Sequence, residues 1–415
     1  MNHTGIELGP ISPQLPNQNG HQQQQRPGNI PRQRFEDLLR NNQLGIVDNP
    51  LYYRNPEDIL HDVEEFYEVH KLTDVVDVEL LKRGALLARD RDEFMEDNIL
   101  SSVERRALLR EENPKFWQQT RELKTVLLTC CIGAIVQGWS QANINGANLF
   151  WPTELGLDVD AQGNPQGGDS WIFGLVNSST YFAASLVGGW LSDPLNEHFF
   201  GRRGALSAAG IFSLAASIGS AYTQSWLALF FCRCLQGIGM GAKAAVVPIF
   251  ESEVSPARIR GRLLVSWQTF TAFGIFLGAS SNLIFHTNWR LQIGSAFIPT
   301  IPLLCLVFIC SESPHWLLKG NRYGEAYVVL QRLRETPLQA ARDLYNLHAQ
   351  IQVETILFSR NQNVSIQLDR WDRHANNLFQ EEFNRTNFFG RLVQLFTVER
   401  NRRASLAASV VMASQ

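Results

Sequence analysis

The sequence predicts an all-α protein that crosses a membrane several times. Its charges are segregated, because Lys124 to Cys310 is a series of long apolar stretches while the flanking regions are rich in charged and amide side chains. Six of these stretches are about 18 to 25 residues long, which is enough for a helix to cross a bilayer. The loops between them alternate between basic and non-basic, as expected of a chain that passes back and forth through a membrane.

The average composition hides this organisation. The chain has 415 residues, of which 19% are charged, and a formal net charge of −3. This near-neutral balance gives no reason to expect nucleic-acid binding. All six cysteines fall inside apolar stretches, which indicates small buried hydrophobic side chains and no disulfide or zinc framework.

Two polar regions precede the apolar one. Residues 1–34 lack the apolar core of a secretory signal and are dominated by Gln, Asn, Pro and Gly, which predicts a disordered tail. Residues 35–122 contain amphipathic patches such as PEDILHDVEEFYEVHKL, which predict a helical region in the cytosol. Membrane insertion must then be driven by the internal helices.

Residues 123–310 form the predicted six-helix block, a multi-pass bundle and not a β-barrel, because no strand-like alternation is present. The expected spans are Thr125–Phe150, Trp171–Leu191, Ala205–Tyr222, Leu227–Val247, Leu264–Ile284 and Leu291–Cys310. The loops after the second and fourth spans carry arginines, whereas Arg290 is the one cation expected on the opposite side. The positive-inside rule therefore places both ends of the block in the cytosol.

The chain becomes polar again after the sixth span. Residues 311–403 contain helical runs such as GEAYVVLQRLRE and are too charged to cross a membrane, which predicts a cytosolic helical linker. Residues 404–415 begin a new apolar run that is too short to cross. We therefore expect the opening of a seventh span in a chain that looks cut.

Two loops carry charged motifs. In GGWLSDPLNEHFFGRRGAL, Asp193 precedes Arg202 and Arg203, and an acid near two arginines can latch a gate through charge and helix-dipole contacts. The alternative is that these arginines only fix the topology by reaching toward the membrane surface.

The second motif is RCLQGIGMGAKAAVVPIFESEVSPARIRGRLLVSWQ. Its glycines at 237, 239 and 241 predict a close helix–helix contact. Pro248 and Pro256 predict a helix break. Glu253 and Arg260 then supply an acid and a cation at the inner face, a pair that can hold one conformation of a two-state carrier.

These two motifs, followed by SESPHWLLKG after the sixth span, resemble the sugar porter branch of the major facilitator superfamily, and most of all its fungal inositol- and hexose-type carriers. The resemblance covers about Lys124 to Gln415. It implies a twelve-helix carrier with two six-helix halves, a helical cytosolic domain between them, and alternating access. This sequence would supply the first half and the linker.

The resemblance also implies roles for single residues. Gln268 matches a fifth-helix glutamine that hydrogen-bonds sugar hydroxyls, although a lone amide in a helix often serves only the bundle itself. Arg233 matches a fourth-helix arginine with a role in gating or coupling, the alternative being a structural partner for backbone carbonyls. In the first span, Gln141, Asn143, Asn145 and Asn148 are expected to face a water-filled cavity, with Gln141 and Asn145 as substrate ligands.

One departure from the family affects coupling. Proton-coupled relatives carry an aspartate where this chain has Ser140, whose hydroxyl does not titrate in the physiological range. Arg233 is thereby left without its expected carboxylate, which is costly inside a membrane. Passive transport, another acid as the partner, or relaxed function would each explain this. Ser311 and His315 also replace the family's proline and arginine, which would weaken the inner latch.

The predicted function is transport of a sugar or cyclic polyol by alternating access, without proton coupling. The alternative is a transport-inactive truncated copy, or a nutrient-sensing or regulatory membrane protein. An enzyme is not expected, because no nucleophile–base pair, metal-spaced His/Cys cluster or phosphate loop is present, and no cofactor is expected. The expected partners are the substrate and the lipid bilayer, the plasma membrane being favoured over the vacuolar one.

Overall fold

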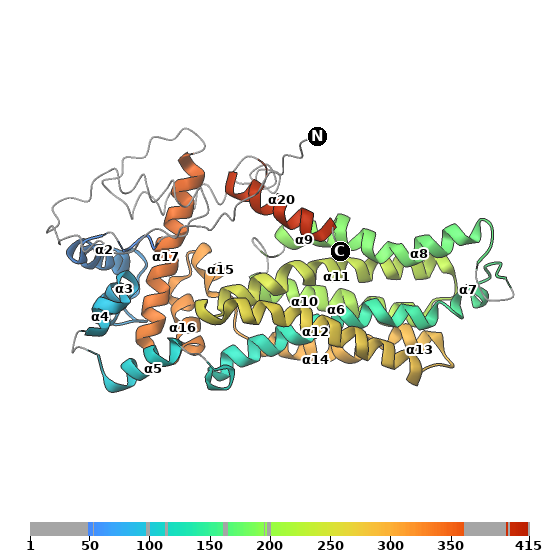
Figure 1. Ribbon diagram of the computed structural model, residues 1–415, viewed down its shortest axis with the longest axis horizontal. Coiled ribbons are helices and arrows are strands. Elements are labelled where there is room, and N and C mark those ends of the chain that lie inside the picture. The colour runs from blue at the N-terminus through green and yellow to red at the C-terminus, as the bar shows by residue number, and fades with distance from the viewer. Residues whose placement is uncertain are drawn as a thin grey trace, which may run out of the picture.

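The computed structural model describes residues 49–360, apart from 53, 97–99, 113–114, 161–164, 195 and 197–200, together with residues 396 and 399–413. Over these residues the protein consists of a long helical bundle and a smaller helical module at one end of it (Figure 1). In this part of the chain the β-structure is one isolated bridge between Val159 and Pro165. The predicted all-α fold is confirmed, while the predicted tail, residues 1–34, lies outside the described residues.

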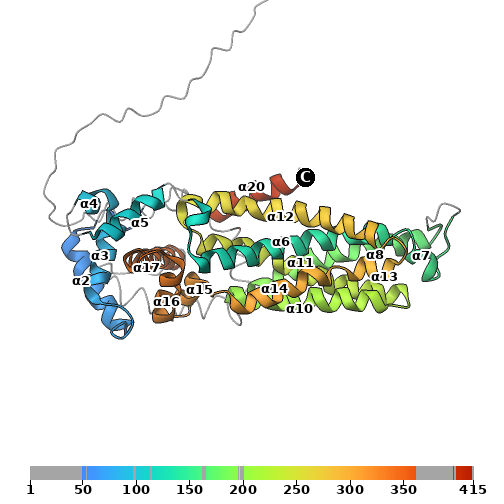
Figure 2. The ribbon, with the colours of Figure 1, turned by 90° about the horizontal axis from the view of Figure 1, so that it is seen from below.

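The bundle contains a helix for every predicted span. Its elements are α6 (Arg121–Ala147), α7 (Trp151–Glu154), α8 (Asp169–Ala183), the π-helical turn η2 (Ala184–Gly188), α9 (Gly189–Pro194), α10 (Gly201–Tyr222), α11 (Trp226–Val254), α12 (Ala257–Ile284), α13 (Trp289–Gly294) and α14 (Phe297–Ile309). The long helices lie side by side in both views (Figures 1 and 2). Helices α10 and α12 both begin at the end where the module lies, so the arginine-rich loops share that end.

Four helices in the described part of the chain are long and apolar enough to cross a membrane: α6, α10, α12 and the stretch Trp289–Ile309. The second predicted span is divided, because α8 ends after 15 residues and continues through η2 into α9. The fourth, α11, is a helix of 29 residues that carries Arg233 and Lys243. Four of the six predicted spans therefore have the expected length and composition, and the count of six stays a prediction.

The outer surface of the bundle is apolar. Leu186 is 70% exposed and Phe276 is 63% exposed. In the most apolar 18-residue stretch of α12, only 11% is buried inside the protein. In water, this exposed hydrocarbon would forgo the stabilisation of about 25 cal/mol per Å² that burial provides. Contact with lipid removes the same surface from water, which agrees with a bundle that spans a membrane.

Polar residues determine where several bundle helices begin. The Thr120 hydroxyl accepts a hydrogen bond from the Leu123 N–H at 3.3 Å, and the Ser225 hydroxyl accepts one from the Ala228 N–H at 3.3 Å. These caps satisfy N–H groups that a helix leaves unpaired in its first turn. The helix starts thus follow from local sequence.

Helices α6 and α12 make the tightest contact of the bundle. A Cβ on Gly138 would lie 2.0 Å from the Thr271 carbonyl oxygen of α12, so this position has no room for a side chain. Gly274 of α12 packs in the same way against Ile135 of α6. Further along, Gly146 packs against Asn282. Because the contacts advance together along both helices, α6 and α12 run parallel.

The helical module combines segments from before and after the bundle. Its elements are α2 (Pro56–Val69), α3 (Val78–Arg89), α4 (Arg91–Glu96), α5 (Ser102–Glu112), the 3-10 turn η1 (Phe116–Gln118), α15 (Pro314–Lys319), α16 (Tyr323–Leu333) and α17 (Pro337–Arg360). Phe66, Leu81, Tyr327 and Leu344 are buried in a shared core. A Cβ on Gly84 of α3 would lie 2.8 Å from the Cβ of Ala341. The regions predicted as separate N-terminal and linker segments therefore fold as one body.

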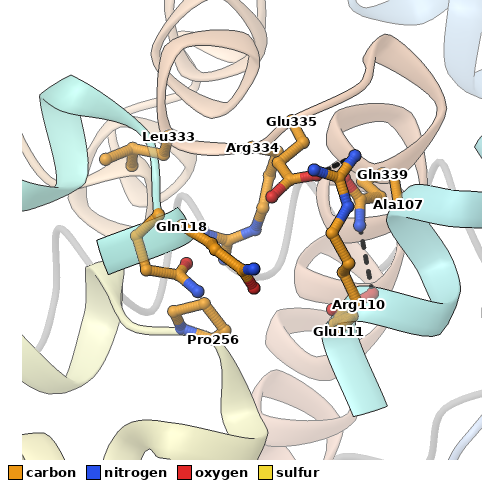
Figure 3. A pocket seen from close by; sticks show the side chains of 10 residues that line it. Ala107, Arg110, Glu111, Gln118, Pro256, Leu333, Arg334, Glu335 and Gln339 are labelled. Carbon is orange, nitrogen blue, oxygen red and sulfur yellow. Dashed lines mark hydrogen bonds and ion pairs between the residues drawn. The ribbon is translucent and has the colours of Figure 1, made fainter. Parts of the chain in front are cut away.

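Several contacts join the module to the bundle. The Thr120 hydroxyl donates to the Leu333 carbonyl at 3.2 Å, and the Arg334 guanidinium donates to the Val254 carbonyl at 3.2 Å. A small pocket lies at this junction, lined mostly by charged and amide side chains such as Arg110 and Glu335, with Pro256 and Leu333 among them (Figure 3). Its volume of about 30 Å³ admits a water molecule or two and excludes a hexose.

A further helix, α20 (Glu399–Ala413), includes most of residues 404–415, where the sequence predicts the start of a seventh span. Much of the predicted linker before it, residues 361–395, lies outside the described residues.

Candidate functional site

The three predicted substrate ligands lie on α6 and α12. Asn145 and Gln268 are exposed, and Gln141 is half-buried. Within the described residues, none of the three side chains has a hydrogen-bond partner. We call these three residues the open amide face, because their donors and acceptors are free to meet a ligand.

The open amide face is extended along the bundle. Gln141 and Asn145 are one helical turn apart on α6. Gln268 lies six residues before Gly274, which contacts Ile135, whereas Gln141 lies six residues after Ile135. At 1.5 Å per residue, Gln268 is about 15 to 18 Å nearer the module than Gln141. The structure therefore places Gln268 at a different depth in the bundle from the two amides of α6.

Other amides of the first span serve the bundle itself. Asn143 is fully buried and its amide donates to the Ile293 carbonyl at 2.9 Å. The Asn148 amide oxygen accepts from the Trp151 indole N–H at 2.8 Å. The expectation that Asn143 faces a cavity is wrong, because its side of α6 packs against α13. Two of the five amides from Gln137 to Asn148 thus serve the protein's own packing.

Arg233 is buried deep in the bundle. Its side chain is 1% exposed, and its guanidinium donates to the Gln236 amide oxygen at 3.3 Å while its Nε has no partner. No carboxylate of the described residues lies within ion-pair distance, as expected from the serine at position 140. The buried Ser140 hydroxyl also lacks a partner there. Since an unpaired cation inside a membrane is costly, Arg233 remains a candidate for a functional role.

A charged cluster closes the module end of the bundle. Arg202 of α10 and Glu253 of α11 form a buried ion pair through two contacts of 2.7 and 3.0 Å. The Ser313 hydroxyl donates to the same carboxylate at 2.6 Å. Glu312 lies beside them, and we call Arg202, Glu253, Glu312 and Ser313 the latch. It joins α10 and α11 to the segment that leads into α15.

The backbone of the Gly-Arg-Arg motif binds the Glu312 carboxylate. Glu312 accepts backbone N–H bonds from Arg202 at 2.9 Å, from Arg203 at 3.1 Å and from Ser313 at 2.9 Å. Burial nevertheless raises the pKa of this carboxyl above its usual value. Gly201 has φ = +68°, and a Cβ there would lie 2.6 Å from a Glu312 carboxylate oxygen, so only glycine fits. The Arg203 side chain donates to the Phe308 carbonyl at 2.5 Å.

Two expectations about the second motif are wrong. Glu253 was expected to pair with Arg260, but Arg202 takes that place and Arg260 donates to the Ser255 carbonyl at 3.4 Å. The reason is that α10 begins beside the end of α11, a contact that sequence spacing does not show. Pro248 does not break the helix, because α11 continues through it to Val254; the expected break lies at Pro256, which precedes the first residue of α12. Asp193 lies on α9, and its side chain is outside the described residues.

The predicted glycine contact of α11 is confirmed on two sides. A Cβ on Gly237 would lie 2.2 Å from the Thr180 carbonyl oxygen of α8, and one on Gly241 would lie 2.3 Å from the Ala184 carbonyl oxygen of η2. A Cβ on Gly239 would lie 2.8 Å from the Ala209 carbonyl oxygen of α10. The stripe therefore lets α11 pack tightly between two neighbours.

Sequence reasoning missed two buried ionisable residues of α11. The Lys243 ammonium donates to the Ser213 hydroxyl at 2.7 Å, and Glu251 accepts from the Ser266 hydroxyl at 2.9 Å. The sequence does indicate both residues, because GAKAAVV and PIFESE each place a charged residue within or beside an apolar run.

The far end of the bundle, opposite the module, has its own ion pair. Arg290, predicted as the one cation of this side, pairs with Glu154 at 3.1 Å and donates to the Thr223 carbonyl. The Trp289 indole donates to the same carboxylate. These contacts tie the loops of this end together.

Comparison with known proteins identifies the family. The family model described as "Sugar (and other) transporter" matches residues 125–378, more than half of the chain. Monosaccharide-sensing protein 3 of Arabidopsis thaliana is 34% identical over 221 residues, which are 52% of this chain and 28% of that protein. The arabinose-proton symporter of Escherichia coli K12 is 32% identical over 259 residues, 60% of this chain and 52% of the symporter.

Two further comparisons agree. Probable inositol transporter 3 of Arabidopsis thaliana is 30% identical over 248 residues, covering 58% of this chain and 40% of that protein. The solved structure of a major facilitator proton:xylose symporter, XylE, matches with a TM-score of 0.51 and 22% identity, over 58% of this chain and 54% of that one. The chain spans about half the length, or less, of the curated relatives named here. It belongs to the sugar (and other) transporter family and shares the helical fold of the major facilitator superfamily.

Proposed function

We propose that this chain supplies one wall of a multi-pass membrane carrier for a sugar or cyclic polyol, which works by alternating access with a second six-helix half. The open amide face carries the proposal. A primary amide both donates and accepts hydrogen bonds, as a hydroxyl does, and Gln141, Asn145 and Gln268 have no partner in the described residues.

The latch supports a carrier that opens and closes. Arg202 and Glu253 connect two helices of the bundle, and Ser313 connects them to the module. Such a cluster can stabilise one conformation of a two-state carrier and separate in the other. We propose that the module lies in the cytosol, which the positive-inside rule supports because the arginine-rich loops are at this end, and that the membrane is the plasma membrane in preference to the vacuolar one.

A second candidate is a sensor that binds the sugar without moving it. The observation in its favour is the 34% identity to a protein named as monosaccharide-sensing. The replacement of the coupling aspartate by Ser140 agrees with either function.

Uptake of radiolabelled glucose and myo-inositol by the full-length gene product, in a host that lacks its own transporters, tests the proposal. We expect uptake of one of them to saturate, and Gln268→Ala to raise its KM about five-fold, since one amide–hydroxyl bond contributes about 1 kcal/mol. Ser280→Ala on the same helix is the control, because the Ser280 hydroxyl donates to the Phe276 carbonyl within α12. Binding of a sugar without uptake would favour the sensor.

A further inference from the structure

Helix α11 buries a carboxyl group that no ion pair neutralises. Glu251 is 1% exposed. One carboxylate oxygen accepts from the Ser266 hydroxyl of α12 at 2.9 Å, while the other is buried without a partner. Among the described residues, no Lys, Arg or His side chain lies within ion-pair distance of it. This differs from Glu253, two residues further on, which is paired with Arg202.

The groups around Glu251 are uncharged. From α6 the thiols of Cys130 and Cys131 face it, and from α12 the hydroxyl of Ser266 does. The nearby charges at this end of α11, Arg202 of α10 and Glu253 of α11 itself, are engaged with each other. A carboxylate in these surroundings loses its hydration and gains no cation in return.

Such a site favours the neutral, protonated carboxyl as long as it stays closed. Burial without a counter-charge penalises the ionised form, whereas contact with water restores it. Glu251 lies at the meeting of α6, α11 and α12, close to the latch. Opening of the latch would therefore bring water to Glu251 and lower its affinity for a proton.

We propose that Glu251 binds and releases the coupled proton of the transport cycle, taking the role that Ser140 cannot fill; this rests on the proposed carrier function. With the module end closed, a proton from water in the outward-facing cavity adds to a Glu251 oxygen. When the module end opens, the same proton passes to cytosolic water and leaves the carboxylate. One proton thus enters with each substrate, and no other reactant is needed.

One hydrogen bond connects Glu251 to α12. Ser266 is half-buried and donates to Glu251, and it lies two residues before the exposed Gln268. The proton site is therefore one hydrogen bond away from a helix that also carries a substrate ligand. Arg233 is 18 residues away on the same helix, about 27 Å, so Glu251 does not neutralise it.

Accumulation and counterflow measured on the full-length gene product test the inference, using whichever of glucose and myo-inositol the wild type transports. We expect a protonophore to reduce wild-type accumulation at least ten-fold. Glu251→Gln should lose accumulation and equilibrate the substrate, while its counterflow stays within about two-fold of the wild type. Accumulation by Glu251→Gln with an unchanged pH profile would overturn the inference. Wild-type uptake that changes neither with pH nor on addition of a protonophore would also overturn it. Absence of any wild-type uptake or counterflow would overturn the carrier function itself.

A pair of serine variants keeps the test decisive if Glu251→Gln does not fold. Ser266→Ala keeps the acid but removes the hydrogen bond that stabilises its ionised form. The pH of half-maximal uptake should then rise by about 0.5 to 1 unit. Ser252→Ala is the matched control, because the Ser252 hydroxyl donates to the Ile249 carbonyl of its own helix and should leave the profile unchanged. No shift in Ser266→Ala would contradict the role of Glu251.

Discussion

The bundle and the helical module are both built from α-helices, yet they differ in whether their buried charged side chains form ion pairs. In the module, Arg342 pairs with Glu111 and Asp343 at 2.7 Å each, and Arg334 pairs with Asp343 at 2.5 Å. In the interior of the bundle, the partners of Lys243 and Glu251 among the described residues are serines.

Apolar side chains show the same contrast. The module buries its apolar residues in a common core, whereas the bundle exposes many of its own on the outside. The difference reflects two surroundings. In the core of a water-soluble module a buried charge is retained where a partner neutralises it, whereas an unpaired ionisable group inside a membrane is costly and is a candidate for a functional role.

The largest effect is expected where the two regions meet. Arg202→Gln leaves the buried Glu253 without its cation and should reduce stability by about 3 to 5 kcal/mol. Thermal unfolding of the purified full-length protein in detergent measures the loss. The double variant with Glu253→Gln should lose less than the two single variants together, and simple additivity would contradict a coupled pair. Arg258→Gln, on the exposed side of α12, is the control.

Within the module, Arg342→Gln should reduce stability by about 1.5 to 3 kcal/mol, because it removes charged hydrogen bonds to Glu111 and Asp343. Hydrogen exchange of α5 and α17 in the full-length protein measures this local loss. Exposed Arg332 of α16 offers the control Arg332→Gln, which should leave exchange unchanged. An equal increase in exchange in Arg342→Gln and Arg332→Gln would contradict the idea that paired charges stabilise the module.

The same cluster predicts a response to acid. Burial opposes ionisation of Glu111 and Asp343, but the Arg342 guanidinium outweighs it and holds the pKa of both carboxyls below their usual values. Their contribution is therefore present above pH 4, near the pKa values of the unfolded chain, and is lost as the pH falls through the lower folded values. The protection of α17 against exchange, relative to the intrinsic rate at each pH, should fall below pH 4 in the wild type and depend less on pH in Arg342→Gln. An equal loss of protection in both would contradict the prediction.

In the bundle, packing replaces charge as the main stabilising interaction. Gly138→Ala places a Cβ against the backbone of α12 and should destabilise by about 1 to 3 kcal/mol. Gly261→Ala has open space around it and should be neutral or slightly stabilising, since alanine favours a helix. Thermal unfolding of both variants in detergent decides this, and a loss in Gly261→Ala as large as in Gly138→Ala would argue against the close α6–α12 contact.

The smallest effect concerns the amides of α6. Asn143→Ala removes a buried bond to the Ile293 carbonyl and should cost about 0.6 kcal/mol, the average for polar contacts between membrane helices. Asn145→Ala should leave the unfolding temperature unchanged and reduce apparent substrate affinity. A loss of stability in Asn145→Ala would show that this amide belongs to packing as well.

The long apolar helices and the glycine stripe of α11 could be predicted because they depend on residues close together in the chain. A run of apolar residues determines its own length, and three glycines at helical spacing predict a close contact whatever the partner is. The partner of Glu253 could not be predicted in the same way, because Arg202 is 51 residues away and Arg260 only seven. Spacing favoured the local cation, and packing of α10 against α11 chose the distant one.

The sequence alone determined that this protein is helical, that it carries membrane-length apolar segments, and that three motifs place it beside sugar carriers. These features follow from local hydrophobicity and motif order, which need no knowledge of the fold. Tertiary structure decided which amides stay open and which serve the bundle, that residues before and after the bundle fold as one module, and that Glu251 is buried without a counter-charge. Those features depend on which helix faces lie against one another, and only the packed chain determines that.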